Sequence, residues 1–250
     1  MQFILHFCTD KPLSLPIGYH SEVQGLIYHI LSANSNYSAF LHNQGYTTEG
    51  RNYKLFVYSL LNGRYEVHMP SITFVDSFSL EVRSPIDEFC DVFVNALMRQ
   101  NQFELNHQTI TLSSYEVRRE EIHTDSVQIE MMSPVCVHRT FITADGRKKT
   151  LYFSPADADY AEYLNMNLAH KLEVCANRKP YREVALSPLY PDHGRMQSRD
   201  KYVTRFAGKT LITAWRGKYE LTGDARDLTF LYDAGLGARN SQGFGMFRVI

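Results

Sequence analysis

The sequence predicts an α+β fold built from two tandem ferredoxin-like domains, residues 1–123 and residues 124–250. Two observations support this fold class. The 250 residues are 44% apolar and 21% charged, which is ordinary for a globular chain and long enough for one large domain or two small ones. The hydrophobic patterns also follow the order β-α-β-β-α-β in the first half and, more loosely, again in the second half.

The first half opens with an apolar strand at residues 3–7. An amphipathic helix is expected at residues 22–32, because apolar side chains recur there at helical spacing. A second, short helix at residues 37–43 should end at Gly45, since glycine suits a left-handed cap. The apolar positions of the first helix are Val23, Leu26, Ile27, Ile30 and Leu31.

The remainder of the first half is predicted to hold two paired strands, a helix and a last strand. Residues 54–61 and 71–82 are the paired strands, with Asn62-Gly63 as the turn between them. An amphipathic helix follows Pro85, and residues 110–117 form the last strand. This order is the ferredoxin-like pattern, which RNA-recognition motifs also use.

The second half repeats the pattern with less regular spacing. Ser154-Pro155 offers an N-cap and a first-turn proline for a long helix that should end at Ala176. Asp157 and Asp159 favour the same helix start, because carboxylates are stabilised near a helix N-terminus. Strands are expected at residues 127–132, 135–142, 184–189, 202–207, 211–221 and 246–250, with a short helix at residues 224–232.

The cysteines and the missing motifs exclude several classes of protein. No CxxC, HxxxH, HExxH or GxSxG spacing occurs, so neither a metal site nor a serine hydrolase is expected. The N-terminus lacks the regions of a signal peptide, and no apolar run approaches about 18 residues. We therefore expect a cytoplasmic protein with no cofactor, no metal and no membrane partner. Four isolated cysteines are interpreted as small core residues of a reduced chain: Cys8, Cys90, Cys136 and Cys175.

Positive charge is concentrated in one segment of a chain whose formal net charge is only −1. Residues 171–218, called here the basic segment, hold 11 Lys and Arg against 4 Asp and Glu. Basic stripes attract phosphate backbones, although any single charge is as readily explained as solvated surface. We predict that four side chains around His193-Gly194 contact RNA phosphates: Arg195, Arg199, Lys201 and Arg205.

Residues 235–245, called here the glycine-rich loop, form the strongest local motif. Consecutive backbone N–H groups of such a loop can hold a phosphate, and its polar side chains add donors. No Gly-Lys-Ser/Thr follows and the loop does not open a helix, so it is neither a P-loop nor a dinucleotide fingerprint. The alternative is an ordinary flexible connection. The loop residues predicted to bind RNA are Gly235, Gly237, Arg239, Asn240, Ser241, Gly243 and Gly245.

The pattern GxGxxxxxGFG of this loop resembles the C-terminal signature of the CRISPR repeat-processing endoribonucleases, members of the RAMP superfamily. Residues 24–31, 40–46, 53–60 and 132–135 resemble the same family in the same order along the chain. The resemblance implies two ferredoxin-like domains and a metal-independent endoribonuclease. Such an enzyme cuts CRISPR repeat RNA in precursor transcripts to mature guide RNAs, leaving 2′,3′-cyclic phosphate and 5′-hydroxyl ends.

Three residues of the first half offer the chemistry that such a cut needs. His42 should lie near the C-terminus of a short helix, where the helix dipole favours imidazolium and hence proton donation. Tyr28 lies off the apolar stripe of its helix, and Lys54 is expected to begin the next strand. The resemblance implies these same three as catalytic residues. His29 is a less favoured substitute, and each residue alone is more often a packing or surface residue.

Two further functions remain open from the sequence. A non-catalytic RNA-binding subunit of a CRISPR ribonucleoprotein complex would share the glycine-rich loop and the basic segment. It would have no chemical reason to combine Tyr28, His42 and Lys54. An unrelated small-molecule enzyme of this fold leaves the loop and the basic segment unexplained. The expected partners are precursor and product CRISPR repeat RNA and other effector-complex subunits, and exposed sheet edges also permit a homodimer.

Overall fold

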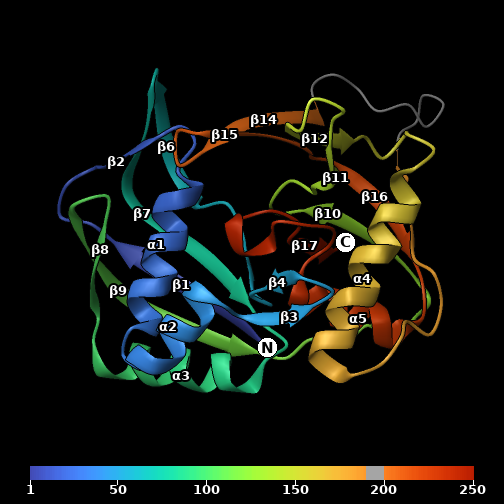
Figure 1. Ribbon diagram of the computed structural model, residues 1–250. Helices are drawn as coiled ribbons and strands as arrows, with labels where there is room; N and C mark the ends of the chain where they lie inside the picture. Colours follow the sequence, from blue (N-terminus) through green and yellow to red (C-terminus); the bar gives the residue numbers. More distant parts are fainter. Residues whose placement is uncertain (190–199) are drawn as a thin grey trace.

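The computed structural model describes residues 1–189 and 200–250 and shows two main sheets with helices packed on each (Figure 1). The first half contains β1 (Gln2–Cys8), β2 (Leu13–Pro16), α1 (His20–Leu31), α2 (Ser35–Asn43), β3 (Tyr46–Thr48), β4 (Arg51–Tyr53), β5 (Val57–Tyr58), β6 (Asn62–His68), β7 (Ser71–Arg83), α3 (Asp87–Arg99), β8 (Gln102–Leu105) and β9 (Gln108–Arg118). The second half contains β10 (Ser126–Met131), β11 (Val137–Ile142), β12 (Lys148–Phe153), α4 (Tyr160–Ala176), β13 (Ala185–Pro188), β14 (Lys201–Phe206), β15 (Thr210–Trp215), β16 (Lys218–Thr222), α5 (Ala225–Ala234) and β17 (Phe247–Val249).

Both main sheets have the ferredoxin-like strand order. In the first, β1 lies between β9 and β7, and β5 pairs with the far side of β7. In the second, the order is β13-β16-β10-β17, with β10 between its two partners. All of these pairs are antiparallel. In each half the first strand of the βαββαβ unit, β1 or β10, lies between two partners and is therefore central. The predicted fold class of two tandem ferredoxin-like domains is confirmed, while the boundary between residues 123 and 124 stays a prediction.

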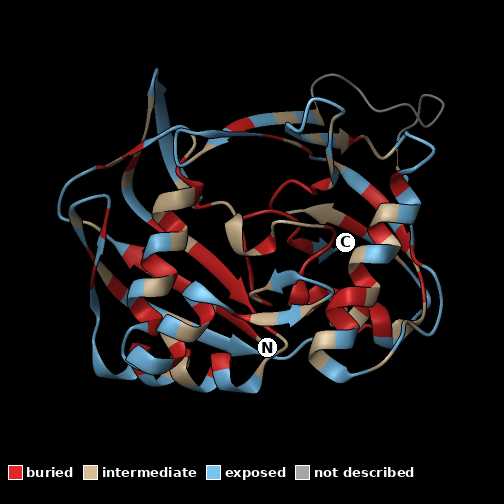
Figure 2. Ribbon diagram, in the orientation of Figure 1, coloured by how far each residue is buried: buried red, intermediate tan, exposed pale blue. Residues whose placement is uncertain are grey.

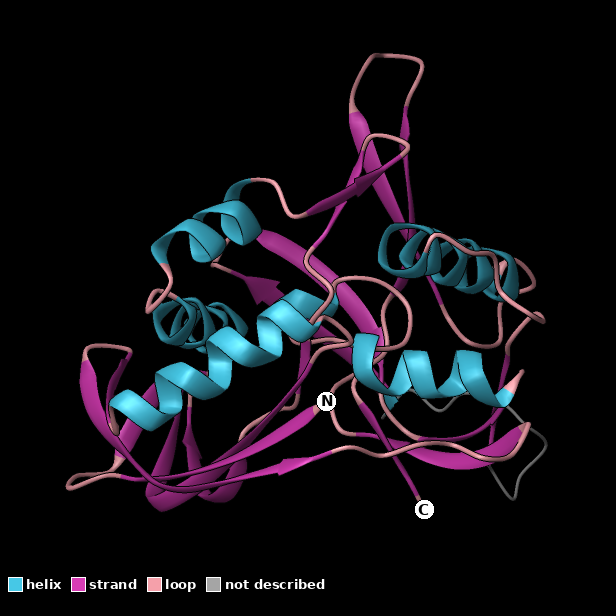
Figure 3. Ribbon diagram, turned by 90° about the horizontal axis from the view of Figure 1, so that it is seen from below, coloured by secondary structure: helices cyan, strands magenta, loops and turns pink. Residues whose placement is uncertain are grey.

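Each sheet buries one face beneath its helices, and Figure 2 shows the two resulting regions of buried residues. In the first half the apolar stripe of α1, including Leu26 and Ile30, belongs to the same core as Phe3 and Leu5 of β1. Figure 3 separates the helices of the first half from those of the second. Among the described residues, no helix is long and apolar enough to cross a membrane.

The predicted turn at Asn62-Gly63 is wrong. These residues begin strand β6, which pairs with β7, and the chain reverses at Met69-Pro70 instead. β7 is 13 residues long, so it can pair with β6 along one stretch and with β5 along another. The strand expected at residues 54–61 is consequently reduced to Val57–Tyr58.

Two predictions in the second half also need correction. The long helix begins at Tyr160 rather than after Ser154, because local hydrogen bonds close a separate turn first. Asp157 Oδ2 accepts from Ser154 N at 2.7 Å, and Ser154 Oγ accepts from Ala156 N at 3.3 Å. The strand expected at residues 211–221 is two strands, β15 and β16. Of the cysteines interpreted as core residues, Cys8 is exposed and Cys175 only partly buried, and all four are free.

Arg83 joins the two halves at the end of β7. Its side chain is 1% exposed, and its Nη1 donates to Tyr232 O and Phe247 O at 3.2 and 2.8 Å. Its Nε donates to Glu81 Oε1 at 2.6 Å, so the charge is paired inside the protein. Removing one member of a buried ion pair leaves the other charge uncompensated, which is far more costly than losing an exposed pair.

Arg83→Met should therefore lower the free energy of unfolding by about 3 kcal/mol or more. Arg118→Met is the matched control, because Arg118 pairs with Glu116 at the same i, i+2 spacing on an exposed strand face. The control should cost less than about 1 kcal/mol. Chemical denaturation of both variants measures the difference, and equal losses would contradict the assigned burial of the Arg83 pair.

Candidate active site and nucleic-acid interface

The structure brings the three catalytic candidates together. Tyr28 lies on α1, His42 in the last turn of α2, and Lys54 just after β4. The Tyr28 and His42 rings meet edge to face with centroids 5.2 Å apart, and Lys54 Nζ donates to His42 O at 2.9 Å. Lys54 lies in a connecting segment and does not begin a strand as predicted. His29 lies apart from this group, with its ring edge-on to Phe103.

Gly45 and the β3–β4 hairpin explain why Lys54 returns to His42. Gly45 has φ +66°, and its N–H donates to Phe40 O at 2.8 Å, which ends α2 as predicted for a left-handed residue. A Cβ on Gly45 would lie 2.5 Å from Tyr53 O and 3.0 Å from Lys54 Cδ. Only glycine therefore allows the chain leaving α2 to pack directly against the segment that carries Lys54.

The three groups differ in their surroundings. Partial burial raises the pKa of Tyr28 to about 12, so its hydroxyl keeps its proton at neutral pH. Burial also lowers the pKa of the Lys54 ammonium from its ordinary value. His42 is exposed, and its Nδ1 lies 3.0 Å from Asn43 Oδ1, an acceptor, which leaves Nε2 available for proton transfer. No group of three or more His, Cys, Asp or Glu in the described parts of the chain is arranged to hold a metal ion.

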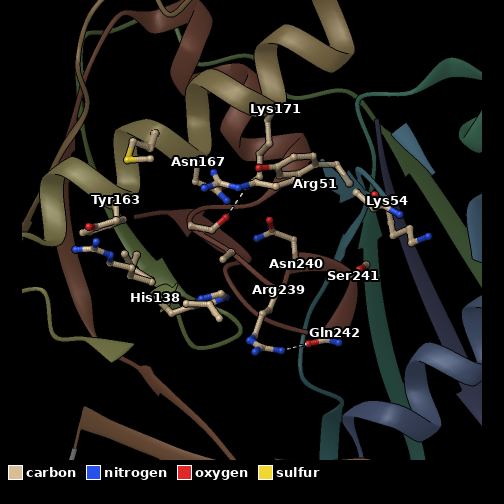
Figure 4. Close-up of a pocket in the computed structure, with 18 of the residues that line it drawn as sticks. Arg51, Lys54, His138, Tyr163, Asn167, Lys171, Arg239, Asn240, Ser241 and Gln242 are labelled. Atoms are coloured by element: carbon tan, nitrogen blue, oxygen red, sulfur yellow. Dashed lines mark hydrogen bonds between the residues drawn. The ribbon is translucent and has the colours of Figure 1, made fainter. Parts of the chain in front are cut away.

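A cavity of about 840 Å³ opens beside Lys54, between the two halves of the molecule (Figure 4). It is lined by the segment around β4, by β11, by α4 and by the glycine-rich loop. Its walls carry six Lys or Arg against the single carboxylate of Glu162, so the cavity is suited to a polyanion. The six cations are Arg51, Lys54, Arg139, Lys148, Lys171 and Arg239.

The glycine-rich loop connects α5 to β17, as predicted, and forms one wall of the cavity. The Asn240 side chain is buried, and its Nδ2 donates to Leu236 O at 3.1 Å and to Phe244 O at 2.9 Å. Lys171 of α4 is 2% exposed and donates to Gly235 O and Gly237 O, each at 2.7 Å. Burial lowers the pKa of Lys171 to about 7. The loop is therefore a braced structure and not a flexible connection.

The predicted RNA-binding residues divide into four groups. Gly237, Arg239, Asn240 and Ser241 line the cavity, whereas Gly235, Gly243 and Gly245 are packed against the protein. A Cβ on Gly243, for example, would lie 2.5 Å from His20 Nδ1. Lys201 and Arg205 are exposed on β14. Arg195 and Arg199, with His193-Gly194, lie outside the described residues.

Part of the basic segment pairs with other residues of the protein, in the interior or at the surface. Lys171 braces the loop, Arg178 pairs with buried Asp227 at 2.7 Å, and Arg182 lies 3.0 Å from Asp125. Three further cavity cations were not predicted, because they do not form a charge run along the chain: Arg51, Arg139 and Lys148. Arg51 lies just before the strand predicted at residues 54–61 and Arg139 within the one predicted at residues 135–142, whereas Lys148 lies outside any predicted element.

His170 of α4 holds the β3–β4 hairpin against the second half. Its Nδ1 lies 2.7 Å from Arg51 Nη1 and 3.2 Å from Tyr53 Oη, while its Nε2 lies 3.1 Å from Glu49 Oε2. Arginine can only donate and carboxylate can only accept, so this geometry defines a neutral imidazole with the proton on Nε2. The network fixes Arg51 at the cavity and the hairpin that leads to Lys54.

Comparison with known proteins identifies the family. The sequence model described as CRISPR associated protein Cas6, C-terminal, matches residues 117–249. The chain belongs to the Cas6 family. The curated CRISPR-associated endoribonuclease Cas6 1 of Methanocaldococcus jannaschii is 27% identical over 252 residues, covering 98% of this chain and 91% of that protein. The CRISPR-associated endoribonuclease Cas6 of Pyrococcus furiosus is 23% identical over 256 residues, covering 100% and 90%.

A solved structure shows the same fold. The Cas6-related protein from Pyrococcus furiosus superposes with a TM-score of 0.81 at 17% identity, covering 100% of this chain and 98% of that one. The glycine-rich loop and β17 fall within the segment that the Cas6 sequence model matches, whereas Tyr28, His42 and Lys54 lie outside it. The family assignment and the catalytic candidates thus come from different parts of the chain.

His20 sits where α1, the glycine-rich loop and β14 meet. It is 1% exposed, stacks on Phe244 with ring centroids 4.7 Å apart, and places Nε2 2.9 Å from Tyr202 Oη. Burial, reinforced by the positive charge of Arg216, lowers its pKa to about 4. The folded protein therefore holds this imidazole neutral at a pH where the unfolded chain already protonates it.

Stability should consequently fall as pH drops from about 6.5 to 4, because the unfolded state binds more protons across that window. His20 contributes up to about 3 kcal/mol to this loss. In His20→Phe, which keeps the stack on Phe244, the free energy of unfolding should decline less steeply over the same window. His107→Phe, at an exposed position, is the control and should keep the wild-type slope. An unchanged slope in His20→Phe would contradict the assignment.

Proposed function

We propose that this chain is a metal-independent endoribonuclease that cleaves CRISPR repeat RNA in precursor transcripts to give mature guide RNAs. The observation that carries the proposal is the position of Lys54. It contacts His42 in the catalytic group and also lines the basic cavity. A backbone held in the cavity therefore runs directly past Tyr28, His42 and Lys54. The curated relatives named as CRISPR-associated endoribonucleases support the same substrate and reaction.

The proposed reaction is attack of a ribose 2′-hydroxyl on the adjacent phosphorus, with loss of the hydroxyl proton to solvent and release of the 5′-oxygen. His42 in its protonated form donates a proton to that oxygen, and its exposed ring can exchange protons with solvent. The Lys54 ammonium stabilises the negative charge that develops on the phosphorane. Tyr28, which keeps its proton, orients the reacting groups by hydrogen bonding. The products are a 2′,3′-cyclic phosphate and a 5′-hydroxyl, and this set needs no metal ion.

We place this activity in the cytoplasm, where precursor transcripts are made. The four cysteines are free in the structure, which suits a reducing compartment. Association with other CRISPR effector subunits and homodimer formation are further proposals. The exposed edges of the sheets are where such contacts would form.

Cleavage of labelled CRISPR repeat RNA in excess EDTA tests the proposal. Wild-type protein should make a single cut, and His42→Ala should reduce its rate by about 10² to 10⁴, the usual contribution of a general acid or base. His107→Ala, an exposed histidine of the first half, is the matched control and should cut normally.

Other results of this assay would point elsewhere. Tight binding without cleavage by the wild type would favour the non-catalytic RNA-binding subunit. Loss of cleavage in EDTA, restored by added metal, would contradict the metal-independent mechanism. Cleavage unaffected by His42→Ala would show that another residue transfers the proton.

Lys201 and Arg205 provide a separate prediction about RNA binding. Both are exposed on β14, four residues apart on one side of the strand. The double variant Lys201→Ala/Arg205→Ala should bind repeat RNA more weakly, with a salt slope flatter by about 1.4, since each lost phosphate contact removes about 0.7. Lys11→Ala/Arg99→Ala removes the same charge from exposed positions elsewhere and should keep the slope. An unchanged salt slope in the β14 variant would contradict the predicted phosphate contacts of Lys201 and Arg205.

A further inference from the structure

Buried polar atoms without partners are concentrated at the cavity. Five buried side-chain nitrogen or oxygen atoms lack a hydrogen-bond partner among the described residues, and three of them belong to side chains that line the cavity. These are His138 Nδ1 on β11, Asn167 Oδ1 on α4 and Arg239 Nε in the glycine-rich loop. Leaving such an atom unsatisfied is costly in a folded protein, so three around one cavity indicate a ligand that completes their hydrogen bonds.

The three atoms do not match a phosphate alone. Arg239 Nε is a donor, but Asn167 Oδ1 is an acceptor, and phosphate oxygens also only accept. A nucleobase edge presents donors and acceptors together, which is what an asparagine amide beside an arginine N–H can recognise. Burial, with the nearby charges of Arg239 and Arg51, lowers the pKa of His138 to about 4. This imidazole is therefore neutral at physiological pH and can either donate or accept at Nδ1, according to its tautomer.

The remaining walls suit a flat ring and its backbone. Tyr163 lines the cavity and is held by stacking on Phe153, with ring centroids 4.8 Å apart. Tyr163 and the neighbouring Met166 give an aromatic and apolar surface against which a base can stack. The volume of about 840 Å³ lies within the usual range of ligand pockets, roughly 300–1,000 Å³. Arg51 and Lys148 supply positive charge on the same walls for the attached phosphate.

We propose that the cavity receives one unpaired base of the RNA and that Asn167, Arg239 and His138 read its edge, so that this pocket sets part of the sequence specificity. Figure 4 shows the three side chains around one space, supplied by α4, the glycine-rich loop and β11. The inference rests on the proposed RNA-processing function. It adds a determinant of base identity, separate from the catalytic residues and from the phosphate contacts.

A thermodynamic cycle between protein and RNA variants tests the pocket. The RNA panel is the repeat from the CRISPR array of the source genome, with one nucleotide at a time made abasic, and binding is followed by fluorescence anisotropy in EDTA. In the wild type, one abasic position should weaken binding about tenfold or more. In Asn167→Leu and in Arg239→Lys, which keeps its charge, the penalty at that position should shrink to about threefold or less. Penalties at the other positions should stay unchanged.

The control is Asn95→Leu, a helical asparagine exposed on α3, which should reproduce the whole wild-type profile. Thermal unfolding of each variant shows whether it is folded. If Asn167→Leu does not fold, the more conservative Arg239→Lys alone tests the pocket. The pocket is refuted if both cavity variants keep the wild-type profile or weaken every RNA equally. If the wild type neither binds nor cuts any repeat RNA, the proposed function is wrong and the proposed base pocket is rejected with it. Normal cleavage with no coupling at the pocket removes only the present inference.

Discussion

The side-chain amide of Asn240 holds together the structure on which the cavity depends. Its two hydrogen bonds tie together the two ends of the glycine-rich loop, at Leu236 O and Phe244 O. A Cβ on Gly235 or Gly245 would collide with this same amide, at 2.5 and 2.7 Å. These glycines therefore allow the loop backbone to pack against the Asn240 side chain, rather than against a ligand. The brace also fixes Arg239 against the cavity.

The loop, so held, connects the two halves of the molecule. Gln24 of α1 donates to Ser241 O, Phe244 stacks on His20, and Ala238 N donates to Cys136 O on the opposite side. Lys171 adds two buried hydrogen bonds beneath the loop, to Gly235 O and Gly237 O. Any change that loosens this segment would disturb both the wall of the cavity and the packing of α1, which carries Tyr28. The three catalytic candidates and the cavity are thus linked through a few backbone carbonyls.

Hydrophobic periodicity was sufficient to predict the fold class, because each central strand and each covering helix buries a regular set of side chains. It failed where strand pairing or side-chain hydrogen bonds override the turn or helix start that the local sequence indicates. Asn62-Gly63 has the composition of a turn, but both residues pair with the long strand β7. The pairing continues past a bulge between Gly63 and Tyr65. Ser154-Pro155 likewise has the composition of a helix start, yet Asp157 closes a turn there before the helix can begin.

The catalytic candidates were identified from a resemblance, and the structure adds that Tyr28, His42 and Lys54 meet. The cavity could not be predicted in the same way. Counting charge along the chain detects runs, whereas Arg51, Arg139 and Arg239 converge only in three dimensions. The same counting overvalued Arg178 and Arg182, whose charges are balanced by Asp227 and Asp125. Unpartnered atoms such as Asn167 Oδ1 have no sequence signal, since their significance lies in what the fold leaves unsatisfied.

The central position of β1 and β10 has a consequence for folding kinetics. In β10, Ile129 pairs with Tyr219 on one side and with Val249 on the other, so both partners come from much later in the chain. β1 is in the same situation between β7 and β9. Contacts between residues so distant in sequence close slowly. During synthesis, each central strand must therefore wait with both edges unpaired, and both strands are open to intermolecular pairing until their partners have been made.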